Sequence, residues 1–353
     1  MGSRSLNKCT YIPVEVKIYR CTLYIECYMR YAHGMSRGLW IAVVGVALVL
    51  LALGVGILFL ERRGEAVEGL LVVLLTPGFE DEVRGLLAGD DRVYVVGAGG
   101  DPHEIQLSPS DVEVLRKADL VISMGHTAVD RRVEELRARG YIKARVLNLL
   151  EMPGLLFPEL PEDHEHEHEH KHEHKHEHKH RGRNYHEPFY DPRNMVVILR
   201  RITDVLVELR PEKRSVYEGN YERLKARLDE MIRAYEGALR GYKAVISTAE
   251  IQPAVEWLGV KVVACVVADR HESPSPRALA KAISEMEEGG VIVFVAVRCD
   301  GTCSLASHLD KRLVEEARSR GLTVVEIPLG YTGTSVIGKL EYITSQVQRL
   351  KGG

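Results

Sequence analysis

The run LLVVLLT at residues 70–76 is the part of the sequence that decides the fold. It is a short, continuously apolar segment, typical of a strand that is buried on both faces of a parallel sheet. A second run of this kind, RVYVVG at residues 92–97, follows a helical pattern over residues 79–87. Strands that alternate with helices form parallel sheets covered by helices, so we predict an α/β structure from residue 70 onward.

The same alternation continues to residue 149 and starts again at residue 244. We predict further helices at 111–117, 129–139, 276–287 and 307–320, and further strands at 118–123, 144–149, 244–247, 261–267, 291–297 and 323–327. The fold class is therefore α/β, with two Rossmann-like lobes built on parallel sheets. Ligands of such lobes bind at the carboxyl ends of the strands, so we expect a binding cleft between the lobes.

A helical segment separates the two series. Apolar residues recur at helical spacing from Val196 to Tyr235, with one interruption at Arg210-Pro211. Proline lacks the backbone N–H that continues a helix. We predict a long helix that joins the lobes as a stiff strut and is kinked or restarted at Pro211.

A membrane anchor is predicted before the first lobe. Residues 39–60, LWIAVVGVALVLLALGVGILFL, carry no charge. At about 1.5 Å per residue they are long enough to cross a hydrocarbon core of about 30 Å. No small-residue cleavage pattern closes the run and no cysteine follows that could carry a lipid, so we expect an uncleaved signal anchor, with the chain after residue 65 outside the cytoplasm. Residues 1–34 lack clear periodicity, and we expect translation to start at Met35 or Met29.

These patterns divide the chain into six segments. They are a cytoplasmic segment (1–38), the transmembrane anchor (39–60), an N-terminal α/β lobe (66–161), a His-rich loop (162–186), the linking helix (191–240) and a C-terminal α/β lobe (241–350).

The composition excludes several classes of protein. The chain has 353 residues, and its 47 basic and 50 acidic side chains nearly cancel, which makes nucleic acid an unexpected partner. Six cysteines are too few for a disulfide scaffold. The unusual feature is histidine, because nine of the 15 histidines lie between His164 and His180.

The tract at residues 164–180 reads HEHEHEHKHEHKHEHKH. This alternation gives neither a strand nor a helix an apolar face, so we predict a flexible loop. Imidazole binds Zn(II), Ni(II), Cu(II) and Co(II), and the tract is predicted to be an auxiliary metal-binding loop. The alternative is a low-complexity expansion without a role. The predicted ligands are His164, His166, His168, His170, His172, His174, His176, His178 and His180.

Four motifs point to one family. The segment GDPHEIQLSPSD at residues 100–111, followed by ADLV at 118–121, resembles a stretch of the zinc and manganese solute-binding proteins of ABC transporters. Three weaker motifs follow in the order of that family: YHEPFYDP at 185–192, LRPE with YEGN between 209 and 220, and ESPSP at 272–276. The resemblance covers residues 70–345 and implies two lobes joined by one rigid helix, with the metal between them.

The resemblance also implies ligands. His103 matches the first ligand of the family and His186 the second. Glu250 is the charged candidate in the second lobe, although Thr248 occupies the usual place. The family's last acidic ligand follows a strand ending in FVE, which here reads FVA at 294–296. Asp300 is a candidate substitute, with a simple turn residue before Gly301 as the alternative.

The remaining cysteines and histidines have structural alternatives. Cys299 and Cys303 could bind metal as thiolates, but outside the membrane a disulfide between them is the better expectation. Cys265, within an apolar strand, is predicted to be a core residue. His126 follows a strand of the first lobe and either lines the cleft or lies at the surface. His271 and His308 are expected to be solvated.

The predicted function is that of a membrane-anchored, extracytoplasmic metal-binding component of an ABC importer, without enzymatic activity. It would capture Zn(II), with Mn(II) or Ni(II) as alternatives, and deliver the ion to a permease. One rival is a cell-surface protein that buffers or stores metal through the His-rich loop. A zinc hydrolase is a second rival, but the sequence shows no positioned general base.

Overall fold

The computed structural model describes residues 45–46, 48–51, 69–97, 103–161, 182–269 and 272–352. By its internal contacts the chain divides into two units, Met1–Glu68 and Gly69–Gly353. Within the described ranges, no helix is both long and apolar enough to cross a membrane. Most of the predicted anchor at 39–60, both predicted start residues and the whole histidine tract lie outside the described residues.

The first lobe is a four-stranded sheet with its helices. The strands are β1 (Leu71–Leu74), β2 (Arg92–Val95), β3 (Leu120–Ser123) and β4 (Arg145–Asn148), all parallel and in the order β2-β1-β3-β4. The helices are α3 (Glu80–Leu86), α4 (Pro109–Lys117) and α5 (Ala128–Ala138). The strands and helices predicted for this region are all present. Strands β1 and β3 are buried because their apolar side chains face helices on both sides of the sheet.

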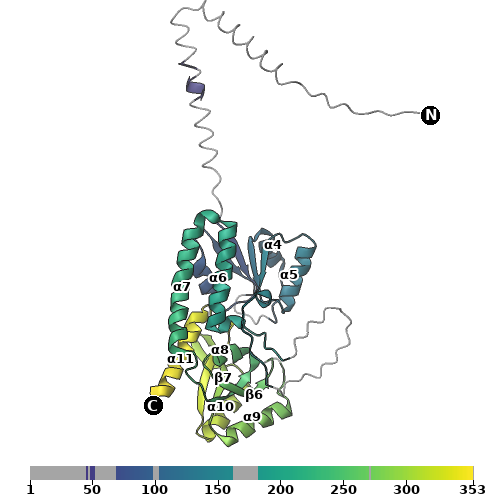
Figure 1. The fold of residues 1–353 in the computed structure, drawn as a ribbon. Helices are drawn as coiled ribbons and strands as arrows, with labels where there is room; N and C mark the ends of the chain where they lie inside the picture. Colours follow the sequence, from purple (N-terminus) through teal and green to yellow (C-terminus); the bar gives the residue numbers. More distant parts are fainter. Residues whose placement is uncertain are drawn as a thin grey trace, which may run out of the picture. The chain divides into compact units, whose positions relative to one another are not determined.

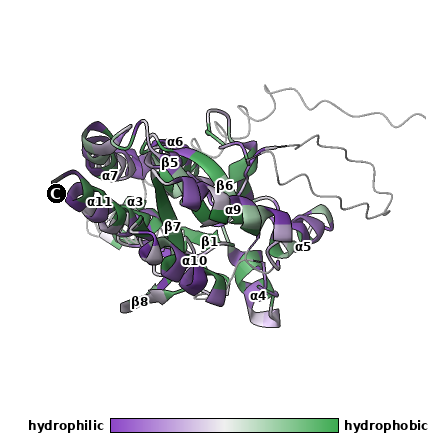
Figure 2. Ribbon diagram, turned by 90° about the horizontal axis from the view of Figure 1, so that it is seen from below, coloured by the Kyte–Doolittle hydropathy of each residue, from purple (hydrophilic) through white to green (hydrophobic). Residues whose placement is uncertain are grey.

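The second lobe contains a larger sheet. Its strands β5 (Lys243–Thr248), β6 (Lys261–Val267), β7 (Val291–Asp300) and β9 (Thr323–Pro328) are parallel, with β6 and β7 on either side of β5 and β9 beside β7. The helices are α8 (Gln252–Glu256), α9 (Pro276–Glu288), α10 (His308–Ser319) and α11 (Val336–Gly352). In Figure 2 the strands β5, β6 and β7 are hydrophobic, whereas α10 carries many hydrophilic residues.

Two features of the second lobe differ from expectation. The sheet is not wholly parallel, because β8 (Thr302–Leu305) runs antiparallel to the end of β7 and forms a hairpin that turns at Gly301. Cys299 and Cys303 face each other in this hairpin and form a disulfide. Helix α11 was not predicted, although its buried residues recur at helical spacing: Val336, Ile337, Leu340, Ile343 and Val347.

The linking segment is restarted near Pro211, as predicted, but it is not a single strut. Helix α6 (Pro192–Leu209) ends before Pro211, a short 3₁₀ turn (Pro211–Lys213) follows, and α7 (Arg214–Tyr235) turns back beside α6 (Figure 1). The reversal brings the Arg200 guanidinium of α6 to 5.0 Å from the centre of the Tyr221 ring of α7. The chain reverses because Arg210 leaves the helical conformation (φ −137°, ψ 76°) ahead of the proline.

Helix α7 is the long helix that joins the two sheets. Its Asn220 side chain donates hydrogen bonds to the carbonyl oxygens of Leu86 and Leu87 in the first lobe, both at 3.0 Å. Its Arg227 pairs with Glu341 of α11 in the second lobe at 2.7 Å. One continuous helix is therefore attached to both lobes.

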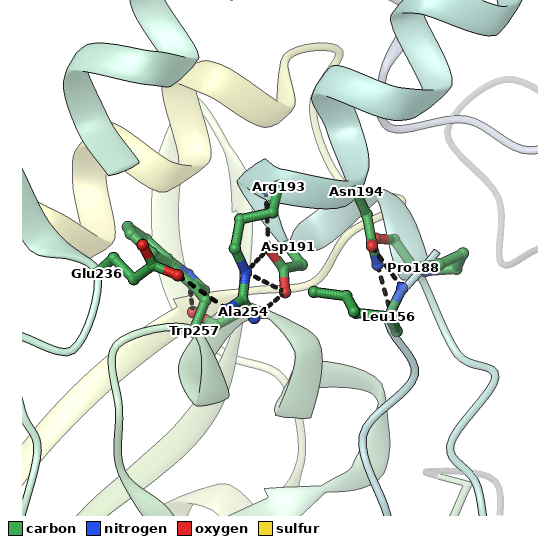
Figure 3. A network of polar contacts seen from close by, with 8 residues as sticks. All are labelled: Leu156, Pro188, Asp191, Arg193, Asn194, Glu236, Ala254 and Trp257. Carbon is green, nitrogen blue, oxygen red and sulfur yellow. Dashed lines mark hydrogen bonds and ion pairs between the residues drawn. The ribbon is translucent and has the colours of Figure 1, made fainter. Parts of the chain in front are cut away.

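The start of α6 is held by a network of polar contacts (Figure 3). Asp191 caps the helix by accepting the backbone N–H of Arg193 at 2.8 Å. The Arg193 guanidinium pairs with Asp191 at 2.6 Å and with Glu236 at 3.0 Å. Asn194 exchanges two hydrogen bonds with the backbone of Leu156. These contacts fix the segment that precedes α6, and this segment also carries His186.

Candidate metal centre

Three histidines from separate parts of the chain meet at one place. His103 lies in the loop between β2 and α4, His126 follows β3, and His186 precedes the 3₁₀ turn Pro188–Tyr190. Their ring centres are 5.5, 5.7 and 5.8 Å apart. One nitrogen of each ring lies within 4.8 Å of the other two, a spacing at which all three could bind a single ion.

The loop that carries His126 is held by the carboxylate of Asp130. This group accepts the backbone N–H of Gly125 at 2.8 Å, of His126 at 3.0 Å and of Thr127 at 2.9 Å. Gly125 has a φ of +98°, and a Cβ there would lie 2.1 Å from the Asn148 side chain, so a glycine is required. The imidazole of His126 is thus placed by a well-supported turn at the carboxyl end of β3.

The environment of His126 favours a neutral ring. Both ring nitrogens are buried, and among the described residues neither has a hydrogen-bond partner. Burial lowers the pKa of His126, and the nearby His103 lowers it further, while Asp130 and Asp269 act in the opposite direction. A neutral imidazole has a lone pair available for a cation. Buried polar atoms without partners are rare, so these two nitrogens point to a ligand.

His186 is tied to the second lobe through its neighbour Asn184. The backbone N–H of His186 donates to Asn184 Oδ1 at 2.9 Å. Asn184 Nδ2 donates to the carbonyl oxygen of Ala249 at 2.7 Å and to Gln252 Oε1 at 2.9 Å. After His186, the backbone adopts a left-handed conformation at Glu187, with a φ of +45°. This conformation is uncommon for a residue other than glycine and persists only where surrounding contacts hold it.

The three rings line a small cavity of about 20 Å³. This volume is sufficient for a single ion or water molecule. Glu250 reaches the cavity from the 3₁₀ turn Ala249–Ile251 after β5, and its side chain is almost fully buried. The other lining residues are Thr76, Met124, Thr127, Glu187 and Tyr331. The two lobes and the segment between them therefore all contribute to the cavity.

The residues predicted from the sequence fall into three groups. His103, His186 and Glu250 line the same cavity. Thr248, at the place where the family has its ligand, lines a separate cavity with Arg298 and His308. The side chain of Asp300 and the nine histidines of the tract lie outside the described residues. For His126 the sequence predicts a place either in the cleft or at the surface. In the structure it lines the cavity, and its position after the third strand was the signal that could have identified it.

The chemistry of the cavity suits a transition-metal ion. Neutral imidazoles are good ligands of zinc, nickel, copper and cobalt, whereas manganese is better served by oxygen. Three nitrogen ligands and one carboxylate oxygen would give the four-coordinate arrangement that zinc prefers. The arrangement needs no reacting group, since capture and release of the ion require only ligands that can move apart.

Comparisons with known proteins show the family and the fold of the chain. The family model described as "Zinc-uptake complex component A periplasmic" matches residues 88–326. No curated protein sequence matches the chain.

Several solved structures share the fold. A Mn-bound periplasmic metal-binding protein of Candidatus Liberibacter asiaticus is 16% identical, with a TM-score of 0.58 over 80% of this chain and 99% of that one. Zn(II)-bound AdcA of Streptococcus pneumoniae is 16% identical, with a TM-score of 0.55 over 80% of this chain and 57% of that one. The solute-binding protein FpvC of Pseudomonas aeruginosa, in complex with Ni²⁺, is 15% identical, with a TM-score of 0.58 over 80% and 98%.

Proposed function

The chain belongs to the zinc-uptake complex component A family and is thus a metal-binding solute-binding protein of an ABC uptake system rather than an enzyme, and from this premise we propose that it captures Zn(II) and delivers the ion to a permease. The observation that carries the proposal is the convergence of three imidazoles on one small cavity. Mn(II) and Ni(II) are the alternative ions, because relatives of the same fold are described with them.

We propose His103, His126, His186 and Glu250 as the ligands. The unpartnered ring nitrogens of His126, as far as the described residues go, support its inclusion. Glu250 would add a negative charge from the second lobe, so an ion would join the two lobes. Asp300 stays a predicted substitute ligand, and Asp300→Asn belongs in the same set of titrations.

The remaining parts of the sequence-based prediction complete the proposal. Residues 39–60 would anchor the protein, the lobes at 66–161 and 241–350 would act outside the cytoplasm, and the tract at 164–180 would bind ions as an auxiliary loop. The rival is a cell-surface protein that buffers or stores metal, in which the tract is the functional part. Its support is the acidic ligand missing from the second lobe, where the strand ends in FVA at 294–296 instead of FVE.

Calorimetric titration of the chain with zinc separates the two functions. The variants are a deletion of residues 162–181, His103→Ala in the deleted chain, and His308→Ala as a control, since His308 is an exposed histidine outside the cavity. The importer function predicts one tight site that survives the deletion and His308→Ala but disappears with His103→Ala. Loss of all binding with the tract would instead favour buffering or storage.

A further inference from the structure

A buried lysine lies beside the cavity without lining it. Lys339, on α11, is only 7% exposed. Its Nζ donates to the carbonyl oxygens of Gly78 at 2.9 Å and Thr332 at 3.1 Å, and also to that of Gly330. An ammonium group has three N–H donors, so these three carbonyls satisfy it completely.

The three carbonyls belong to segments that line the cavity. Gly78 lies two residues after Thr76, in the loop that follows β1 of the first lobe. Gly330 and Thr332 flank Tyr331, in the loop that follows β9 of the second lobe. Since Thr76 and Tyr331 both line the cavity, one ammonium group links its walls on the two lobes.

The segment that carries His186 also packs closely against the loops of Gly78 and Gly330. A Cβ on Gly78 would lie 2.0 Å from the carbonyl oxygen of Gly330, and a Cβ on Gly330 would lie 1.8 Å from Glu187 Oε2. Only glycines allow this approach. Glu187 follows His186 and lines the cavity, so Lys339 supports the junction where the loops of both lobes meet the segment of the second histidine.

The charge of Lys339 is compensated by its surroundings. Burial lowers the pKa of Lys339 to about 8, and the charges of Glu187, Glu82 and Asp81 oppose this effect. The Nζ atom also lies 5.7 Å from the centre of the Tyr190 ring. Three carbonyl acceptors match the three N–H donors of the ammonium form, whose charge attracts carbonyl oxygens, a ring face and carboxylates toward one point.

A second contact between the lobes fixes the helix that carries Lys339. Glu82 of α3 accepts the backbone N–H of Val336 at 3.1 Å and of Ile337 at 2.9 Å, together with the hydroxyl of Ser335 at 2.7 Å. A carboxylate of the first lobe therefore caps a helix of the second. Lys339 is one turn further along this helix, and its position relative to the first lobe is set.

We propose that Lys339 is a positioning residue for metal binding. Its ammonium group would hold the loop after β1, the loop after β9 and the segment of His186 at the spacing at which the histidines and Glu250 close on one ion. The inference rests on the proposed function, since it assigns a role in that same site to a residue that does not touch the metal.

Lys339→Met, which keeps the length of the side chain but removes its charge and donors, tests the inference. The control is Thr344→Val, because Thr344 is buried on the same helix but donates only to the local carbonyl of Glu341 at 3.1 Å. Both chains are titrated with zinc in competition with a chromophoric chelator, and their Co(II) absorption spectra are recorded. Thermal unfolding without metal gives the loss of stability separately.

We expect Lys339→Met to weaken zinc binding by about 10- to 100-fold, the range for residues that orient ligands without touching the metal. The Co(II) spectrum should change, because the ligand geometry changes. Lys339→Arg, which retains the charge, should recover part of the affinity. Thr344→Val should lower the unfolding temperature and leave both the affinity and the spectrum unchanged.

A Lys339→Met chain with wild-type affinity and a wild-type Co(II) spectrum would overturn the inference, even if its unfolding temperature fell. If this variant does not fold, Lys339→Gln is measured in its place, since its amide keeps two N–H donors without the charge. A wild-type chain that binds no metal would overturn the proposed function and the inference with it. Wild-type binding with no effect at Lys339 would overturn the inference alone.

Discussion

The side-chain oxygen of Asn184 accepts the backbone N–H of His186 over a distance of 2.9 Å. The amide nitrogen of the same side chain donates to the carbonyl of Ala249 and to Gln252, which lie on either side of Glu250 in the sequence. Asn184 is only 1% exposed. One buried side chain therefore sets the position of the histidine that precedes α6 relative to a carboxylate in the second lobe.

Replacement of this side chain should weaken metal binding. We expect Asn184→Ala to lower zinc affinity by about tenfold, because both His186 and the turn of Glu250 lose a support. Asn220→Ala is the matched control, since Asn220 also makes two hydrogen bonds between elements, but to Leu86 and Leu87, which do not line the cavity. Competition titrations should show a loss of affinity for the first variant only. Equal affinities would contradict the role assigned to Asn184.

The turn that carries His126 offers a second matched pair. Asp130 accepts three backbone N–H groups around His126, whereas Asp310 caps α10 together with Ser307 and accepts the backbone N–H of Ala296 at 2.8 Å. We expect Asp130→Asn and Asp310→Asn both to destabilise the chain, by about 1–3 kcal/mol, because each leaves buried donors poorly satisfied. Chemical unfolding measures this loss.

Of these two variants, only Asp130→Asn should weaken metal binding. Asp130→Asn releases the loop of His126, so zinc affinity should fall by about tenfold, as for other groups that orient ligands. Asp310→Asn should retain the wild-type affinity in the same titration, because Asp310 does not line the cavity. A reduced affinity in both variants would indicate that general destabilisation, rather than the position of His126, determines binding.

Much of the fold follows from local sequence patterns. Apolar runs such as 70–76 and 291–297 form buried strands because each is long enough for one strand and bounded by helical patterns. Tertiary contacts decided the parts that differ. The reversal between α6 and α7 is stabilised by packing of the two helices against each other, such as the Arg200 guanidinium over the Tyr221 ring. The hairpin at Cys299 and Cys303 depends on cross-strand pairing, which a short polar segment does not indicate in the sequence.

The residues that line the cavity could be predicted only in part, again because tertiary contacts bring some of them together. The resemblance predicts His103, His186 and Glu250, of which His103 and Glu250 also follow strands, and all three line the cavity. His126 carries no motif of its own, and only the spatial order β2-β1-β3 brings it near His103. Lys339 could not be identified, because its three acceptors are backbone carbonyls from two lobes.

The lowered pKa of His126 predicts how stability depends on pH without metal. Burial lowers this pKa, and the nearby His103 lowers it further. The folded state then binds fewer protons than the unfolded state below about pH 6.5, the ordinary value for histidine. The free energy of unfolding should therefore fall as the pH decreases through this range, and this contribution should be constant at higher pH.

Urea unfolding between pH 5 and pH 8, with a chelator present, measures this dependence. His126→Gln should flatten the curve below about pH 6.5 because it removes the buried titrating ring. His308→Gln, at an exposed position, should leave the slope unchanged. A slope that persists in the first variant would show that another group causes it.

The ligand set also predicts which ions the protein prefers. A site with three imidazoles and one carboxylate should bind Zn(II) and Ni(II) more tightly than Mn(II), which gains less from nitrogen ligands. Glu250→Gln removes the negative charge and keeps a neutral oxygen, so it should weaken all three ions. The loss should be largest for Mn(II), because oxygen ligands matter most to that ion. Glu272→Gln, at an exposed position in the second lobe, is the control. Titrations that gave manganese the highest affinity, or an equal loss for all ions in Glu250→Gln, would contradict this ligand set.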